Sequence, residues 1–421
     1  NSQHFPKFPP LLTTPETMSS PVVQRLDVDP ALAHGFLGDP SWALPRRVVK
    51  CDDLARPGYD SKAAHEYLDE PDVLRAKMRV VADLLRRAKA PIAYTGAGIS
   101  TASGIGDYAS RAAGDKSIVK RVQGKRKLGF DARPTKAHRV LAAIARSGRL
   151  WRWVQQNHDG LPQKAGVPQN LLNEIHGAWY DPSNPVVKMS GSLRDDLFAD
   201  LLKVEDETDL CICAGTSLAG MNADRVVETV GSRAAEAHAT GAKSGALGSV
   251  IMSIQSTRLD SVACIRVYAL LDDAFTVLAE ELGLAASPAA AAASPPGGAA
   301  GGAGTEARLP GVTSTEDLFL VPYDEHGRRL PDGAPLRYLD LRRNKKATVT
   351  GGPYASYRAT MDGKRSDSNY RVVVRGVLKG RDGKPSDKGA FAVVLGKWWV
   401  AAAATGSTPT IPLGTTASKS R

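Results

Sequence analysis

A glycine-rich turn is the first candidate for chemistry in this sequence. Residues Gly96–Ser100 read Gly-Ala-Gly-Ile-Ser and follow the apolar run Pro91–Tyr94, which predicts a buried strand. Because glycine has no Cβ, Gly96 and Gly98 would let a phosphate-bearing ligand approach the main chain where the strand ends. The spacing differs from G-x-G-x-x-G, since the next glycine is Gly104. A nucleotide site and a plain glycine turn between a strand and a helix both remain open from this segment alone.

Polar side chains follow a second predicted strand. Residues Leu150–Val154 read as a strand, and Gln156–Leu161 (Gln-Asn-His-Asp-Gly-Leu) come directly after it. Open α/β sheets bind ligands at the carboxyl ends of their strands, where Asn157 and Asp159 could hold ribose hydroxyls or a carboxamide. The alternative is an Asn-Asp-Gly turn, which occurs in many proteins.

Two further segments have the same character. Glu174, His176 and Gly177 form Glu-x-His-Gly, although a single histidine is more often structural than catalytic. The run Ala214–Leu218 (Ala-Gly-Thr-Ser-Leu) ends another predicted strand in a glycine and two hydroxyls. These groups could supply further contacts to phosphate or ribose.

In this order, the four segments resemble the sirtuins, the NAD-dependent protein deacylases. That family carries G-A-G-I-S, I-P-D-[FY]-R, T-Q-N-I-D-G-L, E-x-H-G and G-T-S-L. The resemblance covers roughly residues 65–284, and the lead-in Pro71–Ser103 looks most like the nuclear, chromatin-associated branch. The matching positions are Gly96–Ser100, Gly104–Tyr108, Gln156–Leu161, Glu174–Gly177, Gly215–Leu218, Pro134–Thr135 with His138, and Gln255–Asp260.

The resemblance implies an activity and roles for particular residues. The activity would be NAD-dependent protein-lysine deacetylation that releases nicotinamide and O-acyl-ADP-ribose. His176 would be the general base, and Asn157 and Asp159 would orient the nicotinamide ribose. The implied NAD contacts are Gly96, Ala97, Gly98, Ser100, Ile105, Asp107, Arg111, Gln156, Asn157, Asp159, Gly215, Thr216, Ser217, Ser253 and Gln255, and the implied acyl-lysine contacts are Val187 and Met189.

This chain also departs from the family pattern. Only residues 178–185 separate Gly177 from Val186, and they contain none of the cysteines of the family's zinc module. We therefore expect no zinc and a reduced small domain. The family's motif arginine is Ala109 here, with Arg111 as a possible substitute. Because the substrate-facing motifs are eroded, two alternatives stay open: an NAD-consuming ADP-ribosyltransferase or glycohydrolase, and a non-catalytic NAD or ADP-ribose binding scaffold.

Strand and helix patterns alternate along the middle of the chain. They predict an α/β fold with a Rossmann-like parallel sheet, helices on both faces, and a C-terminal β-rich module. We expect a poorly ordered segment over 1–60, the NAD-binding catalytic domain over 61–284, and an Ala/Gly/Pro linker over 285–304. The basic β-rich module is expected over 305–403 and a flexible tail over 404–421.

Charge is concentrated near the C-terminus of the 421-residue chain. Residues 328–388 hold sixteen Lys and Arg against six Asp, which accounts for nearly all of the formal net charge of +11. The expected partners are an acylated protein, with a histone as one candidate, and a weak acidic or nucleic-acid partner at the basic module. A solvated charged surface is the alternative for that module. No membrane span is predicted.

The cysteines and the visible N-terminal sequence indicate in which cellular compartment the protein is expected. The four cysteines are Cys51, Cys211, Cys213 and Cys264, and none forms a C-x-x-C pair. Cys211 and Cys213 lie two apart in a predicted strand, where they behave as small buried apolar residues. With no secretory segment visible, we expect a nuclear or cytoplasmic protein that is not secreted.

Overall fold

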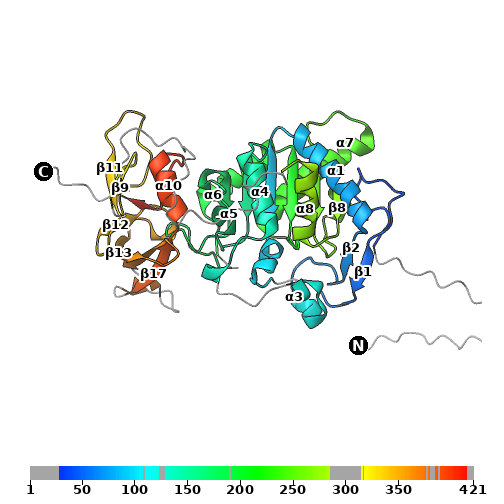
Figure 1. Cartoon of the computed structure of the whole chain (residues 1–421), viewed down its shortest axis with the longest axis horizontal. Helices are drawn as coiled ribbons and strands as arrows, with labels where there is room; N and C mark the ends of the chain where they lie inside the picture. Colours follow the sequence, from blue (N-terminus) through cyan, green and yellow to red (C-terminus); the bar gives the residue numbers. More distant parts are fainter. Residues whose placement is uncertain are drawn as a thin grey trace, which may run out of the picture.

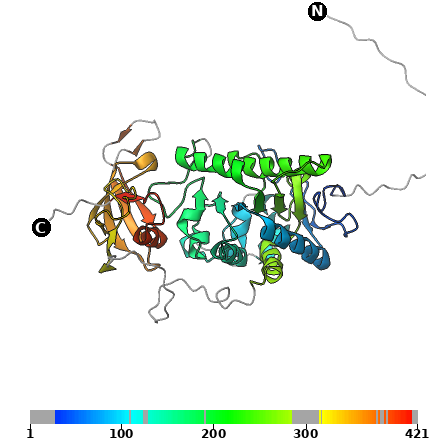
Figure 2. The ribbon, with the colours of Figure 1, turned by 90° about the horizontal axis from the view of Figure 1, so that it is seen from above.

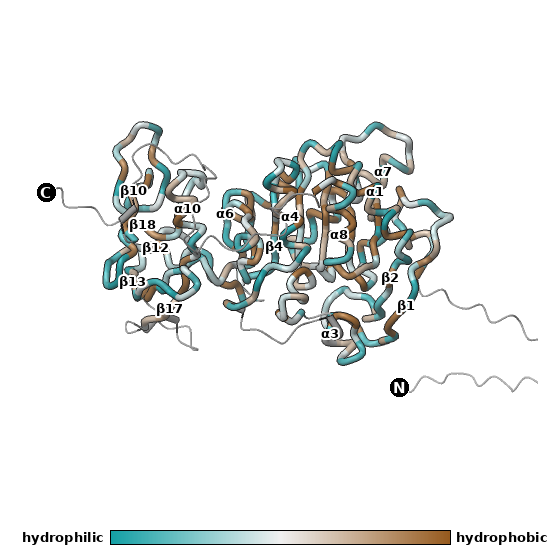
Figure 3. The backbone as a smooth tube through the Cα atoms, in the orientation of Figure 1, coloured by the Kyte–Doolittle hydropathy of each residue, from teal (hydrophilic) through white to brown (hydrophobic). Residues whose placement is uncertain are grey.

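The molecule has a larger α/β unit and a smaller β-rich unit at one end of it (Figure 1). The structure is a computed structural model. It describes residues 28–107, 110–122, 129–188, 191–284, 314–315, 317–375, 378–379, 385–386 and 389–414. Figure 3 shows apolar, brown stretches along the strands and helices of the α/β unit, with hydrophilic, teal stretches between them.

A six-stranded sheet forms the centre of the α/β unit. Its order is β5-β4-β3-β6-β7-β8, and every neighbouring pair is parallel. The chain runs from β3 through β4 to the edge strand β5 and then returns to β6, which lies on the other side of β3. The strand order therefore reverses between β3 and β6, and open α/β sheets bind ligands in the crevice beside the loops at such a point. The strands are β3 (Pro91–Thr95), β4 (Arg152–Gln155), β5 (Leu172–Glu174), β6 (Leu210–Ala214), β7 (Gly248–Met252) and β8 (Ala263–Val267).

Helices cover both faces of this sheet, as the sequence predicted. One apolar cluster joins the sheet to α1 (Pro71–Arg87), α4 (Lys136–Arg146) and α8 (Leu271–Glu281). A second cluster joins the other face to α6 (Asp195–Glu207) and α7 (Arg225–Thr240). Figure 2 shows the long green helix α7 on the opposite side of the strands from α1. The predicted Rossmann-like α/β class is confirmed.

Short helical segments connect these elements. The 3-10 helix η1 (Ala97–Ser103) follows β3 and carries predicted site residues, and α5 (Leu161–Lys164) follows the loop after β4. The others are α2 (Ser110–Ala113), η2 (Gly114–Lys116), α3 (Ile118–Val122), η3 (Gly129–Asp131), η4 (Gln169–Leu171), η5 (Asn222–Asp224) and η6 (Asp260–Val262).

The N-terminal prediction needs correction for residues 28–60. Strand β1 (Arg46–Val49) pairs with β2 (Glu66–Leu68), and the Tyr67 amide donates to the Ile254 carbonyl at 2.8 Å. A Cβ on Gly35 would lie 2.6 Å from the Cys264 carbonyl oxygen, so this segment lies directly on β8. It packs through irregular main-chain contacts, which leave no hydrophobic periodicity for sequence reasoning to detect.

The described residues of the C-terminal unit form small antiparallel sheets and the helix α10 (Lys397–Thr405). Its main sheet has the order β17-β14-β13-β12-β18, beside a three-stranded sheet β11-β10-β9 and the pair β15-β16. The strands are β9 (Ser314–Thr315), β10 (Leu318–Val321), β11 (Arg337–Asp340), β12 (Lys346–Val349), β13 (Arg358–Lys364), β14 (Tyr370–Arg375), β15 (Leu378–Lys379), β16 (Pro385–Ser386), β17 (Ala390–Leu395) and β18 (Leu413–Gly414), with the 3-10 turn η7 (Gly352–Tyr354) between β12 and β13.

The predicted flexible tail is wrong for residues 404–414. Ile411 and Leu413 are buried, and β18 pairs with β12 at the sheet edge. The expected linker, 285–304, and residues 415–421 lie outside the described part of the chain. Within that described part, no helix is long and apolar enough to cross a membrane.

Candidate functional site

The loops after β3 and β6 meet in a corner that only glycines allow. The Gly98 amide donates to the Gly215 carbonyl at 2.7 Å. A Cβ on Gly98 would lie 2.7 Å from the Gly215 Cα, and one on Gly96 would lie 2.8 Å from the Thr216 Cβ. Side chains at these positions would keep the two loops apart. The glycines therefore let the loops approach each other, and the main chain stays uncovered at the carboxyl edge of the sheet.

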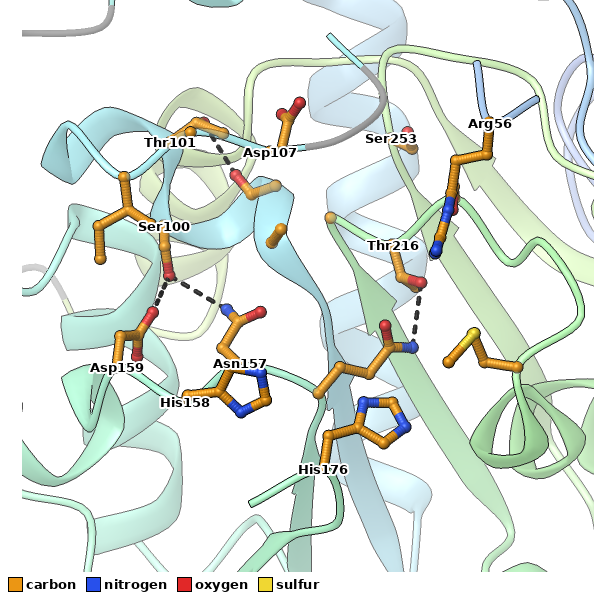
Figure 4. A pocket seen from close by; sticks show the side chains of 18 of the residues that line it. Arg56, Ser100, Thr101, Asp107, Asn157, His158, Asp159, His176, Thr216 and Ser253 are labelled. Atoms are coloured by element: carbon orange, nitrogen blue, oxygen red, sulfur yellow. Dashed lines mark hydrogen bonds between the residues drawn. The ribbon is translucent and has the colours of Figure 1, made fainter. Parts of the chain in front are cut away.

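A cavity of about 520 Å³ opens at this corner (Figure 4). Its size lies in the range of natural ligand sites. Main chain, hydroxyls, amides, two imidazoles and apolar side chains form its surface. Among the residues that line it are Ala97, Gly98, Ser100, Ile105, Asp107, Gln156, Asn157, His158, Asp159, His176, Val187, Gly215, Thr216, Ser217, Ser253 and Gln255.

Asp159 is fixed at the base of the cavity. The Ser100 hydroxyl donates to its carboxylate at 2.6 Å, and the Leu161 amide donates to it at 2.9 Å. The Asn157 amide donates to the Ser100 hydroxyl at 3.1 Å and to the Gly96 carbonyl at 3.0 Å. Burial raises the pKa of Asp159, while the hydrogen bond from Ser100 opposes that shift. The segments after β3 and β4 are thus joined through side chains that face the cavity.

Gln156 joins the same strand tip to β6. Its amide donates to the Thr216 hydroxyl at 3.2 Å, and it also contacts the Tyr94 hydroxyl. The Tyr94 hydroxyl in turn donates to Asp224 at 2.8 Å. Because these bonds tie three strand ends together, this side of the cavity is held by a connected polar network.

His176 faces the cavity from the loop after β5 (Figure 4). Burial, together with the neighbouring charges of His158 and Arg56, lowers the pKa of His176 to about 4, and a hydrogen bond with the Gln156 main chain opposes that shift. The imidazole is therefore neutral at pH 7 and can accept a proton. The His176 carbonyl accepts from the Val187 amide at 3.0 Å, which ties this loop to the predicted substrate segment.

Almost all of the predicted site residues come together in this cavity. Gly96 lies behind its surface, where its carbonyl is bonded to Asn157. The Arg111 side chain and Met189 lie outside the described residues, so their predicted roles remain predictions.

Sequence reasoning missed several residues that line the cavity, among them Arg56, Tyr59 and Trp179. Arg56 comes from the N-terminal segment, and Figure 4 shows its side chain pointing into the cavity near Thr216. Its guanidinium lies 4.2 Å from the centre of the Tyr59 ring. The sequence carries no motif around Arg56, and only the packing of residues 28–69 on the sheet brings it here.

Comparison with known proteins gives the family. The Sir2 family matches residues 115–184. An NAD-dependent protein deacetylase of Saccharolobus solfataricus is 30% identical over 235 residues, which cover 44% of this chain and 88% of that protein. The chain belongs to the Sir2 family, the sirtuins.

Two sirtuins from animals are more similar over shorter stretches. NAD-dependent protein deacetylase Sirt6 of Drosophila melanogaster is 35% identical over 130 residues, 29% of this chain and 40% of that protein. Human NAD-dependent protein deacetylase sirtuin-7 is 35% identical over 119 residues, 27% of this chain and 29% of that protein. The chain thus spans well under half the length of these two sirtuins.

The sirtuin zinc module has no visible counterpart. Across the described residues, no group of three or more His, Cys, Asp or Glu side chains could hold a metal ion. Cys211, Cys213 and Cys264 are buried in the sheet as free thiols, as the strand pattern indicated for the first two. That this sirtuin binds no zinc remains a prediction.

Proposed function

We propose that this sirtuin is an NAD-dependent protein-lysine deacylase that releases nicotinamide and O-acyl-ADP-ribose. One observation carries the proposal: the glycine corner of β3 and β6 and the neutral imidazole of His176 face the same cavity. The relatives named NAD-dependent protein deacetylases support the choice of reaction.

The residues of the cavity suit NAD. Its volume accommodates a dinucleotide, and the glycine corner presents bare main chain with the Thr216 and Ser217 hydroxyls beside it. We assign the ADP part to Gly96, Ala97, Gly98 and Gly215 with these hydroxyls, and to Ser253 and Gln255. We assign the nicotinamide end to Ser100, Ile105, Asp107 and Asn157. When bound, NAD supplies an activated ribose carbon from which nicotinamide can leave.

The side chains around that ribose divide the remaining work. Asn157 and Asp159 are held by Ser100, so they can orient ribose hydroxyls without reorganising. Neutral His176 can remove a proton from a ribose hydroxyl. His158 shares the loop with Asn157, and its ring is bonded to the Gly177 carbonyl at 2.8 Å, which holds the two catalytic loops together.

The acyl-lysine would enter beside Val187 and Lys188, which line the cavity on the side of His176. We propose an acylated protein as the substrate, with a histone as the first candidate. We also propose a nuclear or cytoplasmic location. Support for a nucleic-acid partner at the C-terminal unit is weaker, because many of its cations already pair with carboxylates. Examples are Arg328 with Asp324, Arg342 with Asp340, and Arg371 with Asp362.

The test follows nicotinamide release from NAD with and without an acetyl-lysine peptide. We expect release that depends on the peptide, and His176→Ala should reduce it by about a thousandfold while leaving NAD affinity within about twofold. His238→Ala is the matched control, because His238 lies on α7 against Phe36 and away from the cavity.

The other functions have distinct outcomes. Release that does not depend on peptide would favour a glycohydrolase or ADP-ribosyltransferase. Binding without release would favour a scaffold. Unchanged turnover in His176→Ala would remove His176 as the base.

A further inference from the structure

Four aromatic rings connect the C-terminal unit to the cavity loops; we call them the aromatic junction. They are Phe130, Trp179, Tyr180 and Trp398. The Trp398 ring, on α10, lies 4.9 Å from the Tyr180 ring, centre to centre, and Phe130 meets Tyr180 edge-on at 5.3 Å. Trp179 lines the cavity, so the junction reaches from the C-terminal unit to the ligand site.

Close main-chain contacts fix the position of Trp398 in the aromatic junction. The Gly396 amide, two residues before Trp398, donates to the Tyr180 carbonyl at 2.9 Å. A Cβ on Gly160 would lie 2.8 Å from the Tyr180 ring and 3.1 Å from the Trp398 ring. Gly160 also has φ of +63°, which favours glycine. Trp398 therefore packs against residues of two loops at once.

Those two loops carry the residues assigned to chemistry. Gly160 immediately follows Asp159 in the loop after β4, and Tyr180 lies four residues after His176 in the loop after β5. The loops bond to each other, since the Trp179 amide donates to the His158 carbonyl at 2.9 Å. Trp398 contacts both loops, through Gly160 and Tyr180.

Other contacts hold the C-terminal unit at the same place. The Arg365 guanidinium lies 4.9 Å from the centre of the Phe130 ring. Gly352 approaches the Ser183 carbonyl so closely that a side chain at Gly352 would collide with it. The segment 178–185, which is short in this sirtuin, is thus covered by the C-terminal unit.

We infer that Trp398 is a positioning residue for catalysis: the C-terminal unit holds the Asp159 and His176 loops in their working arrangement through the aromatic junction. The inference rests on the proposed function, because it concerns the same cavity. The glycine corner lies in the loops after β3 and β6, whereas the ring contacts of the junction join residues 130, 179, 180 and 398, so nucleotide binding should depend on Trp398 much less than turnover does. Small displacements of catalytic groups cost large factors in rate.

The experiment compares kcat and KM in the full chain with NAD and an acetyl-lysine peptide. We expect Trp398→Ala to lower kcat about tenfold and to leave the KM for NAD within about twofold. Trp398→Phe keeps a ring against Tyr180 and should restore most of kcat. Tyr338→Ala is the control, because Tyr338 is exposed on β11 of the same unit. If Trp398→Ala does not fold, Trp398→Leu replaces it.

Unchanged kcat in Trp398→Ala, or a Phe variant no better than the Ala variant, would overturn the inference. A measurement that does not depend on turnover tests the role of Trp398 separately from the proposed function. Amide hydrogen exchange over 157–161 and 176–180 should rise in Trp398→Ala and stay at the wild-type level in Tyr338→Ala. Wild-type protein without nicotinamide release would count against the proposed function, whereas equal exchange in these loops would count against the role of Trp398.

Discussion

The two sides of the cavity are built differently. The nucleotide wall, formed by residues 96–100 and 215–217 after β3 and β6, includes the buried Ser100 and Thr216 and is joined by hydrogen bonds to Asn157, Gln156 and Asp159. The substrate wall, formed by residues 187–188, 191 and 193, adjoins the exposed Val186 and is tied to the His176 loop by the Val187 amide. We therefore expect substitutions on the nucleotide wall to act on nucleotide binding, and substitutions on the substrate wall to act on the acyl-lysine substrate.

The largest effect on ligand binding is expected at the nucleotide wall. Gly98→Ala would place a Cβ 2.7 Å from the Gly215 Cα, so the two loops must separate. We expect ADP-ribose affinity to fall at least about a hundredfold, equivalent to about 2.7 kcal/mol. Isothermal titration calorimetry measures this directly. Gly245→Ala is the control, because a Cβ there has nothing within 4 Å. Equal affinity in both variants would mean that the glycine corner does not shape the nucleotide site.

The same contrast explains what the sequence could reveal. The nucleotide wall was predictable because strand, glycine turn and hydroxyls are contiguous in Pro91–Ser100 and again in Leu210–Ser217. Strand β5 gave no such signal, since Leu172–Glu174 has three residues and owes its place to pairing with β4. The contribution of Arg56 depends on tertiary packing of an irregular segment, which local patterns do not encode. The coverage of residues 178–185 by Trp398 likewise comes from a contact distant in sequence.

Beneath the His176 loop lies a buried carboxyl that should make stability depend on pH. Burial raises the pKa of Glu174 to about 7, despite hydrogen bonds from Gln155 and Gln169. The folded state therefore binds this proton more tightly than the unfolded state. The stabilisation is complete below the unfolded pKa, near 4.5, and is lost as pH rises through about 7.

We accordingly expect wild-type stability to fall by roughly 3 kcal/mol between pH 4.5 and pH 8 through this group. Glu174→Gln should remove most of that slope. Urea unfolding at both pH values gives the comparison, and Glu236→Gln, an exposed change on α7, should keep the wild-type slope. A slope that is identical in wild type and Glu174→Gln would show that Glu174 ionises normally in the folded chain.

Arg56 extends the nucleotide wall from outside the sheet. Its guanidinium faces the region of Thr216, so it should favour the diphosphate of a dinucleotide (Figure 4). We expect Arg56→Ala to weaken ADP-ribose binding about tenfold and to leave adenosine binding unchanged. Arg87→Ala is the control, since Arg87 pairs with Asp83 on the surface of α1. Equal losses for ADP-ribose and adenosine would show that Arg56 does not act on the diphosphate.

The smallest effect is expected on the substrate wall, where two adjacent valines make a matched pair. Val187 lines the cavity, whereas Val186 is 43% exposed and does not. Val187→Ala removes apolar surface beside His176 and should raise the KM for an acetyl-lysine peptide about threefold, with the KM for NAD unchanged. Val186→Ala should change neither constant. Because the two variants remove the same atoms one residue apart, a larger effect at Val186 would place the acyl-lysine path on the outer side of this segment. If Val187→Ala changed the KM for NAD alone, residue 187 would belong to the nucleotide site, and the two walls would not differ in function.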